Sequence, residues 1–272
     1  MMRRTAGFTL IEAIMVIAIT GILASIVAVF IKGPVEGYFD SARRADMTDA
    51  ADATLRRIAR DVQTALPNSL RASTDPSPGK CFEFLPVLGG GRYRYAQNSA
   101  ATGSVFNFTT INAFSFDVLA NQKLGSLPAG TNHVVVYNLG IGGADAYNSD
   151  NRRSISGVSG TSPNMTIALN AGVRFPFESP GKRFQVIPDY SVTYSCSGTT
   201  LYRTTQSISA TPLAACPTTG TAVVTNVDCA NSSFQYTPAV SQRNGLLTLT
   251  LTLTQSGESV RLYHEVHVDN VP

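Results

Sequence analysis

Residues 1–31 read MMRRTAGFTLIEAIMVIAITGILASIVAVFI, and this stretch decides the fold. A short basic leader precedes an apolar run from Phe8 to Ile31, within which Glu12 carries the one ionisable side chain. As an α-helix, a run of this length extends about 36 Å and crosses the ~30 Å hydrocarbon core of a bilayer. The sequence therefore predicts a membrane-spanning helix with one carboxylate at membrane depth.

Charge around the apolar run predicts its orientation. Arg3 and Arg4 precede the run, so the positive-inside rule keeps the amino terminus cytoplasmic and places the residues after Ile31 on the exported side. An ordinary cleaved signal peptide has a shorter apolar core and a small-x-small cleavage site, which residues 31–34 do not offer. A plain anchor leaves Glu12 unexplained, because a carboxylate at membrane depth is costly unless it is paired.

The order Gly7-Phe8-Thr9-Leu10, with Glu12 shortly after it, resembles the prepilin signal of type IV pilins and of the pseudopilins of type II secretion. The resemblance implies that a prepilin peptidase cuts between Gly7 and Phe8 and that Phe8 becomes N-methylated. It also implies that Glu12 pairs with the amino terminus of a neighbouring subunit. Such pairing would remove part of the cost of burying each charge.

A second helical stretch succeeds the apolar run. Its apolar side chains recur at steps of three and four, namely Met47, Ala51, Leu55, Ile58, Val62 and Leu66. The charged residues on the other faces are solvated or contact neighbouring subunits. We predict one continuous helix that ends before Pro67. Many pilins carry a proline where Val29 stands here, so any kink or melted stretch should be displaced toward Gly33-Pro34.

Beyond Pro67 the pattern changes to short strands. The clearest is Leu246–Thr254, LLTLTLTLT, whose leucines and threonines alternate between two faces. With a turn at 255–259 and a strand at Val260–Val268, it predicts an antiparallel hairpin whose apolar face lies on the amphipathic helix. Further strands are predicted at 81–88, 92–96, 113–119, 133–138, 166–169, 184–187, 191–196 and 201–205, with long loops at 140–163 and 215–231.

These patterns predict an α+β, pilin-like fold, in which one long amino-terminal helix packs on a carboxyl-terminal antiparallel sheet domain. The expected segments are a leader (1–7), a membrane and filament-core helix (8–31), its amphipathic continuation (32–66) and a β-rich exported domain (67–272). A globular part of this size resembles minor pilins and large minor pseudopilins, which are found at filament tips. Residues 33–45, 55–69 and 267–272 resemble the MshO-type minor pilins of the mannose-sensitive haemagglutinin (MSHA) pilus.

The cysteines indicate an oxidising compartment. Cys81, Cys196, Cys216 and Cys229 form no C-x-x-C pair and have no histidine close in sequence, so two disulfides are favoured over a zinc site or reduced thiols. The sequence does not choose among the three possible pairings. A weak preference for Cys216–Cys229, with Cys81–Cys196, rests on the short Pro/Gly/Thr-rich loop that the first pair would close.

Other constellations give little support for an enzyme or a cofactor. His264 and His267 lie three apart in a predicted strand and so point to opposite faces. Asp145, Asn148 and Asp150 form an acidic, amide-rich loop that could hold calcium, but without the EF-hand pattern. Charged residues make up 14 % of the chain, against about 25 % in an average soluble domain, and no basic run indicates nucleic-acid binding.

The sequence therefore predicts a non-enzymatic minor subunit of a type IV pilus, anchored in the inner membrane and later extracellular. Its expected partners are the prepilin peptidase, the major pilin and other minor pilins. It would prime assembly or support adhesion near the filament tip. The alternatives are a type II secretion pseudopilin, a membrane-anchored periplasmic enzyme or binding protein, and a DNA-capturing tip subunit. The last would need a basic patch from residues such as Arg92, Arg94, Lys182 and Arg183.

Overall fold

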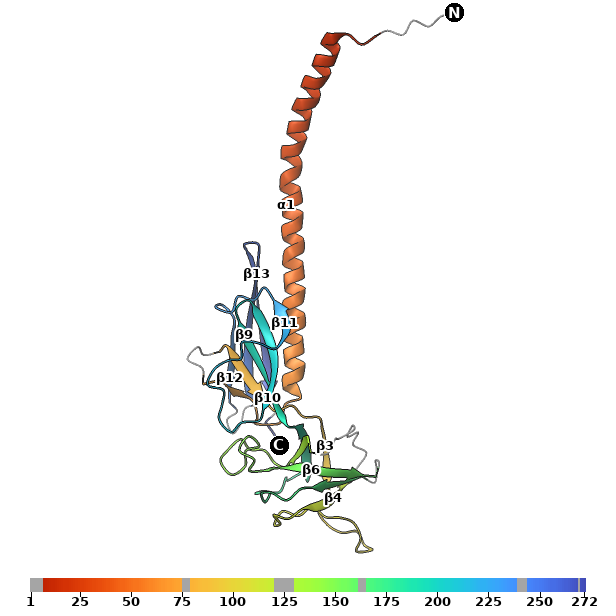
Figure 1. Cartoon of the computed structure of the whole chain (residues 1–272), viewed down its shortest axis with the longest axis vertical. Coiled ribbons are helices and arrows are strands. Elements are labelled where there is room, and N and C mark those ends of the chain that lie inside the picture. The colour runs from red at the N-terminus through yellow and green to blue at the C-terminus, as the bar shows by residue number, and fades with distance from the viewer. Residues whose placement is uncertain (1–6, 75–78, 120–129, 161–164, 239–243, 269) are drawn as a thin grey trace, which may run out of the picture.

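The computed structural model in Figure 1 describes residues 7–74, 79–119, 130–160, 165–238, 244–268 and 270–272. The helix α1 (Leu10–Gln63) projects its amino-terminal half away from the rest of the chain, and its carboxyl-terminal half lies beside β-sheets. A second group of strands lies beyond the carboxyl-terminal end of the helix. The predicted α+β architecture, one long helix packed on antiparallel sheets, is confirmed.

The buried side of α1 matches the predicted apolar stripe. Its buried residues are Met47, Ala51, Thr54, Leu55, Ile58, Ala59 and Val62. The helix ends at Gln63, slightly earlier than predicted, and the N–H of Thr64 donates to the carbonyl oxygens of Arg60 and Asp61. The helical backbone continues through Gly33 and Pro34, so no melted stretch forms there.

The strands form two open sheets and a closed barrel. The sheet orders are β1-β2-β9-β10-β11 and β12-β13-β14, and the barrel order is β3-β4-β7-β6-β5-β8. Their bounds are β1 Arg71–Ala72, β2 Cys81–Phe84, β3 Gly89–Tyr93, β4 Phe114–Leu119, β5 Asn132–Val135, β6 Arg152–Ser159, β7 Met165–Leu169, β8 Arg183–Pro188, β9 Tyr190–Ser197, β10 Thr200–Ser207, β11 Thr221–Thr225, β12 Ser233–Thr237, β13 Gly245–Gln255 and β14 Glu258–Val268. The sequence did not predict β1, β6, β11, β12 or the barrel closure, and β6 and β11 were wrongly assigned to loops.

The predicted hairpin on the amphipathic helix is confirmed. β13 and β14 pair from Gly245 opposite Val268 to Gln255 opposite Glu258. The two loop residues, Ser256 and Gly257, have φ values of 51° and 81°, as a type I′ turn requires. The alternate leucines of β13 are buried in one cluster with α1, and these are Leu247, Leu249, Leu251 and Leu253. We call α1 from Met47 onward together with the two open sheets the helix lobe.

The barrel strands and their loops enclose a separate core and form what we call the barrel lobe. Aromatic rings fill this core, with the Phe106 ring 4.7 Å from that of Tyr93 and 4.8 Å from that of Phe116. A buried arginine, Arg153, supports one side by donating to the carbonyl oxygens of Asn112 (2.7 Å) and Asn170. The barrel lobe therefore has an apolar core that is separate from the core around α1.

A third apolar cluster joins the two lobes, and its buried members are Leu66, Leu85, Val135, Ala146, Tyr147 and Ile187. Beside it, the side-chain amides of Asn68 and Asn138 donate to the backbone carbonyl oxygens of Asn138 (2.8 Å) and Pro67 (2.7 Å), respectively. Arg71 pairs with buried Glu83 at 2.7 Å, and its guanidinium lies 3.4 Å from the ring centroid of Tyr147. These contacts fix the barrel lobe to the carboxyl-terminal end of the helix.

All four cysteines form disulfides, but the preferred pairing was wrong. The bonds join Cys81 to Cys216 and Cys196 to Cys229, with Cα–Cα distances of 5.7 and 5.6 Å. The reason is strand register. Cys81 on β2 lies opposite Ser195 on β9, so Cys196, one residue further along, points to the other face of the sheet. Each cysteine therefore bonds to a loop cysteine that approaches its own face.

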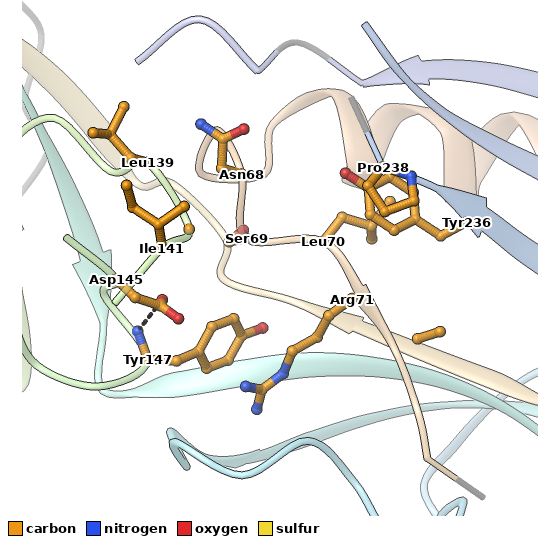
Figure 2. Close-up of a pocket in the computed structure, with 12 residues that line it drawn as sticks. Asn68, Ser69, Leu70, Arg71, Leu139, Ile141, Asp145, Tyr147, Tyr236 and Pro238 are labelled. Atoms are coloured by element: carbon orange, nitrogen blue, oxygen red, sulfur yellow. Dashed lines mark hydrogen bonds between the residues drawn. The ribbon is translucent and has the colours of Figure 1, made fainter. Parts of the chain in front are cut away.

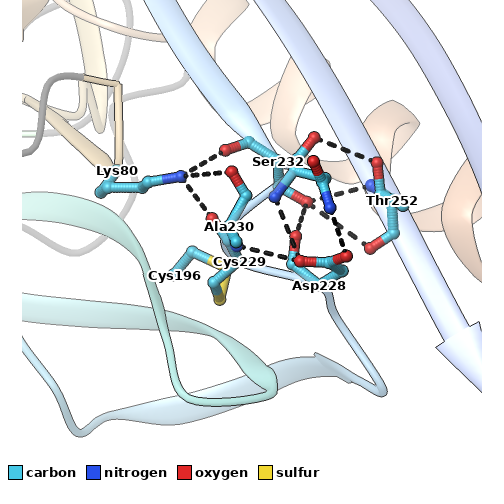
Figure 3. The surroundings of a disulfide bond; sticks show 8 residues. Lys80, Cys196, Asp228, Cys229, Ala230, Ser232 and Thr252 are labelled. Atoms are coloured by element: carbon cyan, nitrogen blue, oxygen red, sulfur yellow. Dashed lines mark hydrogen bonds between the residues drawn. A yellow bond between two sulfur atoms is a disulfide. The ribbon is translucent and has the colours of Figure 1, made fainter.

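The loop that carries Cys229 is held by side-chain caps, as Figure 3 shows. The ammonium of Lys80 donates to the carbonyl oxygens of Cys229, Ala230 (3.2 Å) and Ser232 (2.9 Å). The carboxylate of Asp228 accepts from the backbone amides of Ala230 and Asn231. The side-chain amide of Asn231 also donates to this carboxylate and, as the largest contribution, lowers the pKa of Asp228. The loop is thus positioned by more than the disulfide.

Candidate processing and assembly site

The predicted processing site precedes the first turn of α1. Gly7 and Phe8 are exposed and lie outside the helix, and Thr9 is the N-cap residue, with φ −82° and ψ 151°. The Thr9 hydroxyl accepts from the backbone N–H of Glu12 at 3.4 Å. The bond between Gly7 and Phe8, at the predicted processing site, therefore lies outside the helix.

Glu12 lies in the first helical turn, where a negative charge interacts favourably with the helix dipole. Thr9 and Glu12 also have the spacing of a capping box, of which the structure contains the threonine half. This local contribution was not predicted, although the T-x-x-E spacing is visible in the sequence. Within the described residues, the Glu12 carboxylate has no hydrogen bond or ion pair, so it remains available to a group from another molecule.

The apolar run is uncovered along its whole length. Its most hydrophobic 18-residue window has a mean hydropathy of 2.9 and is 0 % buried within the chain. Large side chains such as Leu10 (80 %), Ile17 (71 %) and Phe30 (76 %) are mostly exposed. By length and composition this helix can cross a membrane. Such a surface is stable only in lipid or against other apolar helices.

The candidate calcium loop is stabilised by its own backbone. Asp150 accepts from the amides of Gly143 (2.9 Å) and Asp145 (3.3 Å), while Asp145 accepts from the amide of Tyr147 at 2.9 Å. Asn148 is exposed. Figure 2 shows Asp145 and Tyr147 beside Arg71 on one side of a cavity of about 440 Å³ at the junction of the lobes. The carboxylates therefore act as turn caps, and this role explains their positions without a bound cation.

The two histidines of β14 face opposite sides of the strand. His264 faces the helix side of β14, and His267 faces the solvent side, as their spacing predicted. Among the described residues no group of three or more metal-binding side chains occurs.

The four basic residues of the candidate nucleic-acid patch do not act as one group. Arg94 pairs with Asp117 at 3.0 Å and Lys182 pairs with Glu178, whereas Arg92 and Arg183 lie opposite each other on neighbouring strands.

Comparison with known proteins identifies the amino-terminal segment. Residues 2–28 match the prokaryotic N-terminal methylation motif. Comparisons with curated proteins and with solved structures gave no match. The matched segment contains Gly7, Phe8 and Glu12, together with most of the uncovered apolar run.

The motif and the fold together are similar to those of type IV pilins and pseudopilins, which are a structural and non-enzymatic class. The motif implies processing by a prepilin peptidase. The motif and the apolar helix also indicate anchoring in the inner membrane before assembly.

Proposed function

We propose that this protein is a minor subunit of a type IV pilus, of the MSHA type, that occupies the filament tip. The observation that carries the proposal is the uncovered apolar half of α1, which begins shortly after the Gly7–Phe8 bond and holds Glu12, a residue that has no partner within the described part of the chain. Cleavage at that bond creates a positive amino group at Phe8. In the filament, the run leaves the lipid for a bundle of like helices, in which Glu12 meets such an amino group from a neighbour.

The placement of the barrel lobe supports a tip position. The uncovered half of α1 spans the membrane, so the barrel lobe lies at the end of the molecule farthest from it (Figure 1). In a continuous filament with helices along its axis, this lobe would occupy space needed by the next subunit outward. The tip is the one position without such a neighbour. There the barrel lobe could prime assembly or present an adhesive surface.

Processing is tested by intact-mass analysis of the membrane form. Loss of residues 1–7 plus a gain of one methyl group is expected. A chain that keeps residues 1–7, or one that is cut elsewhere, would remove the amino group that the pairing requires. The proposed tip position is tested separately, with gold-labelled antibody against the barrel lobe. Labelling at filament ends is expected, and regular labelling along the filament length would contradict the tip assignment.

The pairing role of Glu12 is tested with Glu12→Gln, which keeps the shape of the side chain but removes its charge. We expect the variant to be exported and cleaved but to enter filaments poorly. Glu36→Gln is the matched control, since Glu36 lies on the same helix beyond the apolar run and is already paired with Lys32 at 3.8 Å. Equal incorporation of both variants would reject the pairing mechanism while leaving the anchor and the fold intact.

The second candidate is a minor pseudopilin of a type II secretion system, because the same helix and the same processing site serve both machines. Crosslinking from the apolar run discriminates between the two. A photoreactive residue in place of Ile17 should capture a major pilin in the first case and a major pseudopilin in the second. A membrane-anchored periplasmic binding protein would give neither product.

A further inference from the structure

Two arginines face each other on the outer surface of the barrel lobe. Arg92 on β3 and Arg183 on β8 are directly opposite in an antiparallel ladder, and both side chains are exposed. Like charges opposite each other in a sheet repel and destabilise it. Within the described residues, neither guanidinium forms a hydrogen bond or an ion pair. The pair is thus an unneutralised concentration of positive charge.

The basic residues next to this pair already have acidic partners. Arg94, two residues along β3, is paired with Asp117, and Lys182, next to Arg183, is paired with Glu178. Arg92 also lies opposite Leu119 on β4, and the adjoining sequence, ANQKLGSLPA at residues 120–129, contains no acid. Since no acidic side chain of the described residues pairs with Arg92 or Arg183, another molecule can supply the counter-charge.

The surface beside the pair is hollow. Gly90 and Gln185 lie two residues along the same strands, on the same face of the sheet as the two arginines, and also lie opposite each other. A Cβ atom at Gly90 would lie 2.6 Å from the carbonyl oxygen of Phe184, so no larger residue fits there. A cavity of about 410 Å³ is lined by residues 90–92 and 183–185. The polar side chains among its lining residues are those of Arg92, Arg183 and Gln185.

We propose that this cavity binds a phosphate monoester group. Two guanidinium forks offer parallel N–H donors that match the oxygens of phosphate, and their combined charge of +2 balances the charge of about −1.5 to −2 on a monoester near pH 7. A carboxylate, with a single charge, leaves one of the two positive charges unbalanced. The site is on the barrel lobe, away from the processing and assembly site, and it is independent of the proposed pilus function.

The test is a titration of the full-length protein in detergent, with the thermal midpoint as the readout. Inorganic phosphate should raise the midpoint, and glucose 6-phosphate should do the same if the group is carried on a larger molecule. Response to either probe supports the site, and a response to inorganic phosphate alone identifies the free ion as the ligand. Sodium chloride and acetate at matched ionic strength should have at least ten-fold smaller effects. An equal effect of acetate would overturn the assignment to phosphate.

Two substitutions localise the effect. Arg183→Gln should raise the half-saturating phosphate concentration at least ten-fold, and its ligand-free midpoint should equal or exceed that of the wild type because a repulsion is removed. Arg261→Gln removes the same charge from exposed β14 in the helix lobe and should leave the titration unchanged. The proposal would be overturned if Arg183→Gln bound phosphate as well as the wild type does. It would also be overturned if a single-stranded oligonucleotide raised the thermal midpoint more, per phosphate group, than glucose 6-phosphate does.

Discussion

The two disulfides close loops of very different length, which gives a sharp prediction about stability. The sequence separation is 135 residues for Cys81–Cys216 and 33 for Cys196–Cys229. In the chain-entropy treatment, a loop of the first size stabilises the folded state by about 5 kcal/mol and one of the second size by about 4 kcal/mol. The Cys81→Ser/Cys216→Ser double variant should therefore lose about 1 kcal/mol more than the Cys196→Ser/Cys229→Ser variant.

The same variants test the connectivity directly. In Cys81→Ser/Cys216→Ser, the remaining cysteines are partners in the structure, with a Cα–Cα distance of 5.6 Å, so alkylation under denaturing, non-reducing conditions should modify no thiol. The alternative pairing of Cys81 with Cys196 would leave two orphaned cysteines in this variant. Detection of two alkylated thiols by intact mass would refute the register argument. Urea unfolding of both variants then measures the stability difference.

Core packing in the helix lobe and the burial of one histidine give two further predictions. Leu251 on β13 is 0 % exposed, so Leu251→Ala should lower the free energy of unfolding by about 2–5 kcal/mol. Thr254→Ala, on the exposed end of the strand, should change it by less than about 0.5 kcal/mol. Chemical denaturation measures both variants, and a small loss for Leu251→Ala would contradict the packing of the hairpin on α1. Burial, with the nearby positive charge of Arg152, lowers the pKa of His133, and Asp189 only partly opposes this shift. The imidazole therefore binds a proton more tightly in the unfolded chain than in the folded one, so the free energy of unfolding should fall as the pH drops below about 6.5. Urea midpoints measured above and below this pH should show a weaker pH dependence for His133→Gln than for the wild type. His267→Gln, on the solvent side of β14, is the control, and an unchanged pH dependence in His133→Gln would contradict the assignment.

The parts of the fold that the sequence predicted have apolar residues that recur with one regular spacing. The apolar stripe of α1 and the Leu/Thr alternation of β13 each follow a single face, because each packs one side into the same core. Strand β6 lacked that signal, since one of its inward residues is Arg153, whose charge is satisfied by loop carbonyl oxygens. Strand β11 has no fully buried residue, so its pattern was indistinguishable from a loop.

The candidate sites differ in the same way, since only some of them leave a local pattern in the sequence. Gly7, Phe8 and Glu12 were visible because membrane insertion leaves a local signature within a few residues. The arginine pair depends on a strand pairing between residues 92 and 183, and no local pattern encodes that register. The sequence alone placed Arg94 and Lys182 in one group with these two arginines. Only the structure separates the neutralised residues from the free pair.

The distribution of burial along α1 separates folding from assembly. Among the described residues, the first buried side chain of the helix is Met47, and all earlier apolar residues remain available to lipid or to other helices. The core of the helix lobe, both disulfides and the barrel lobe therefore form without any contribution from the apolar run. The transfer of the run from lipid to a helix bundle that we propose would therefore leave the energetics of the folded lobes unchanged. In the proposed function, a subunit built in this way completes its fold while it is still anchored in the membrane, and Glu12 influences only its later entry into the filament.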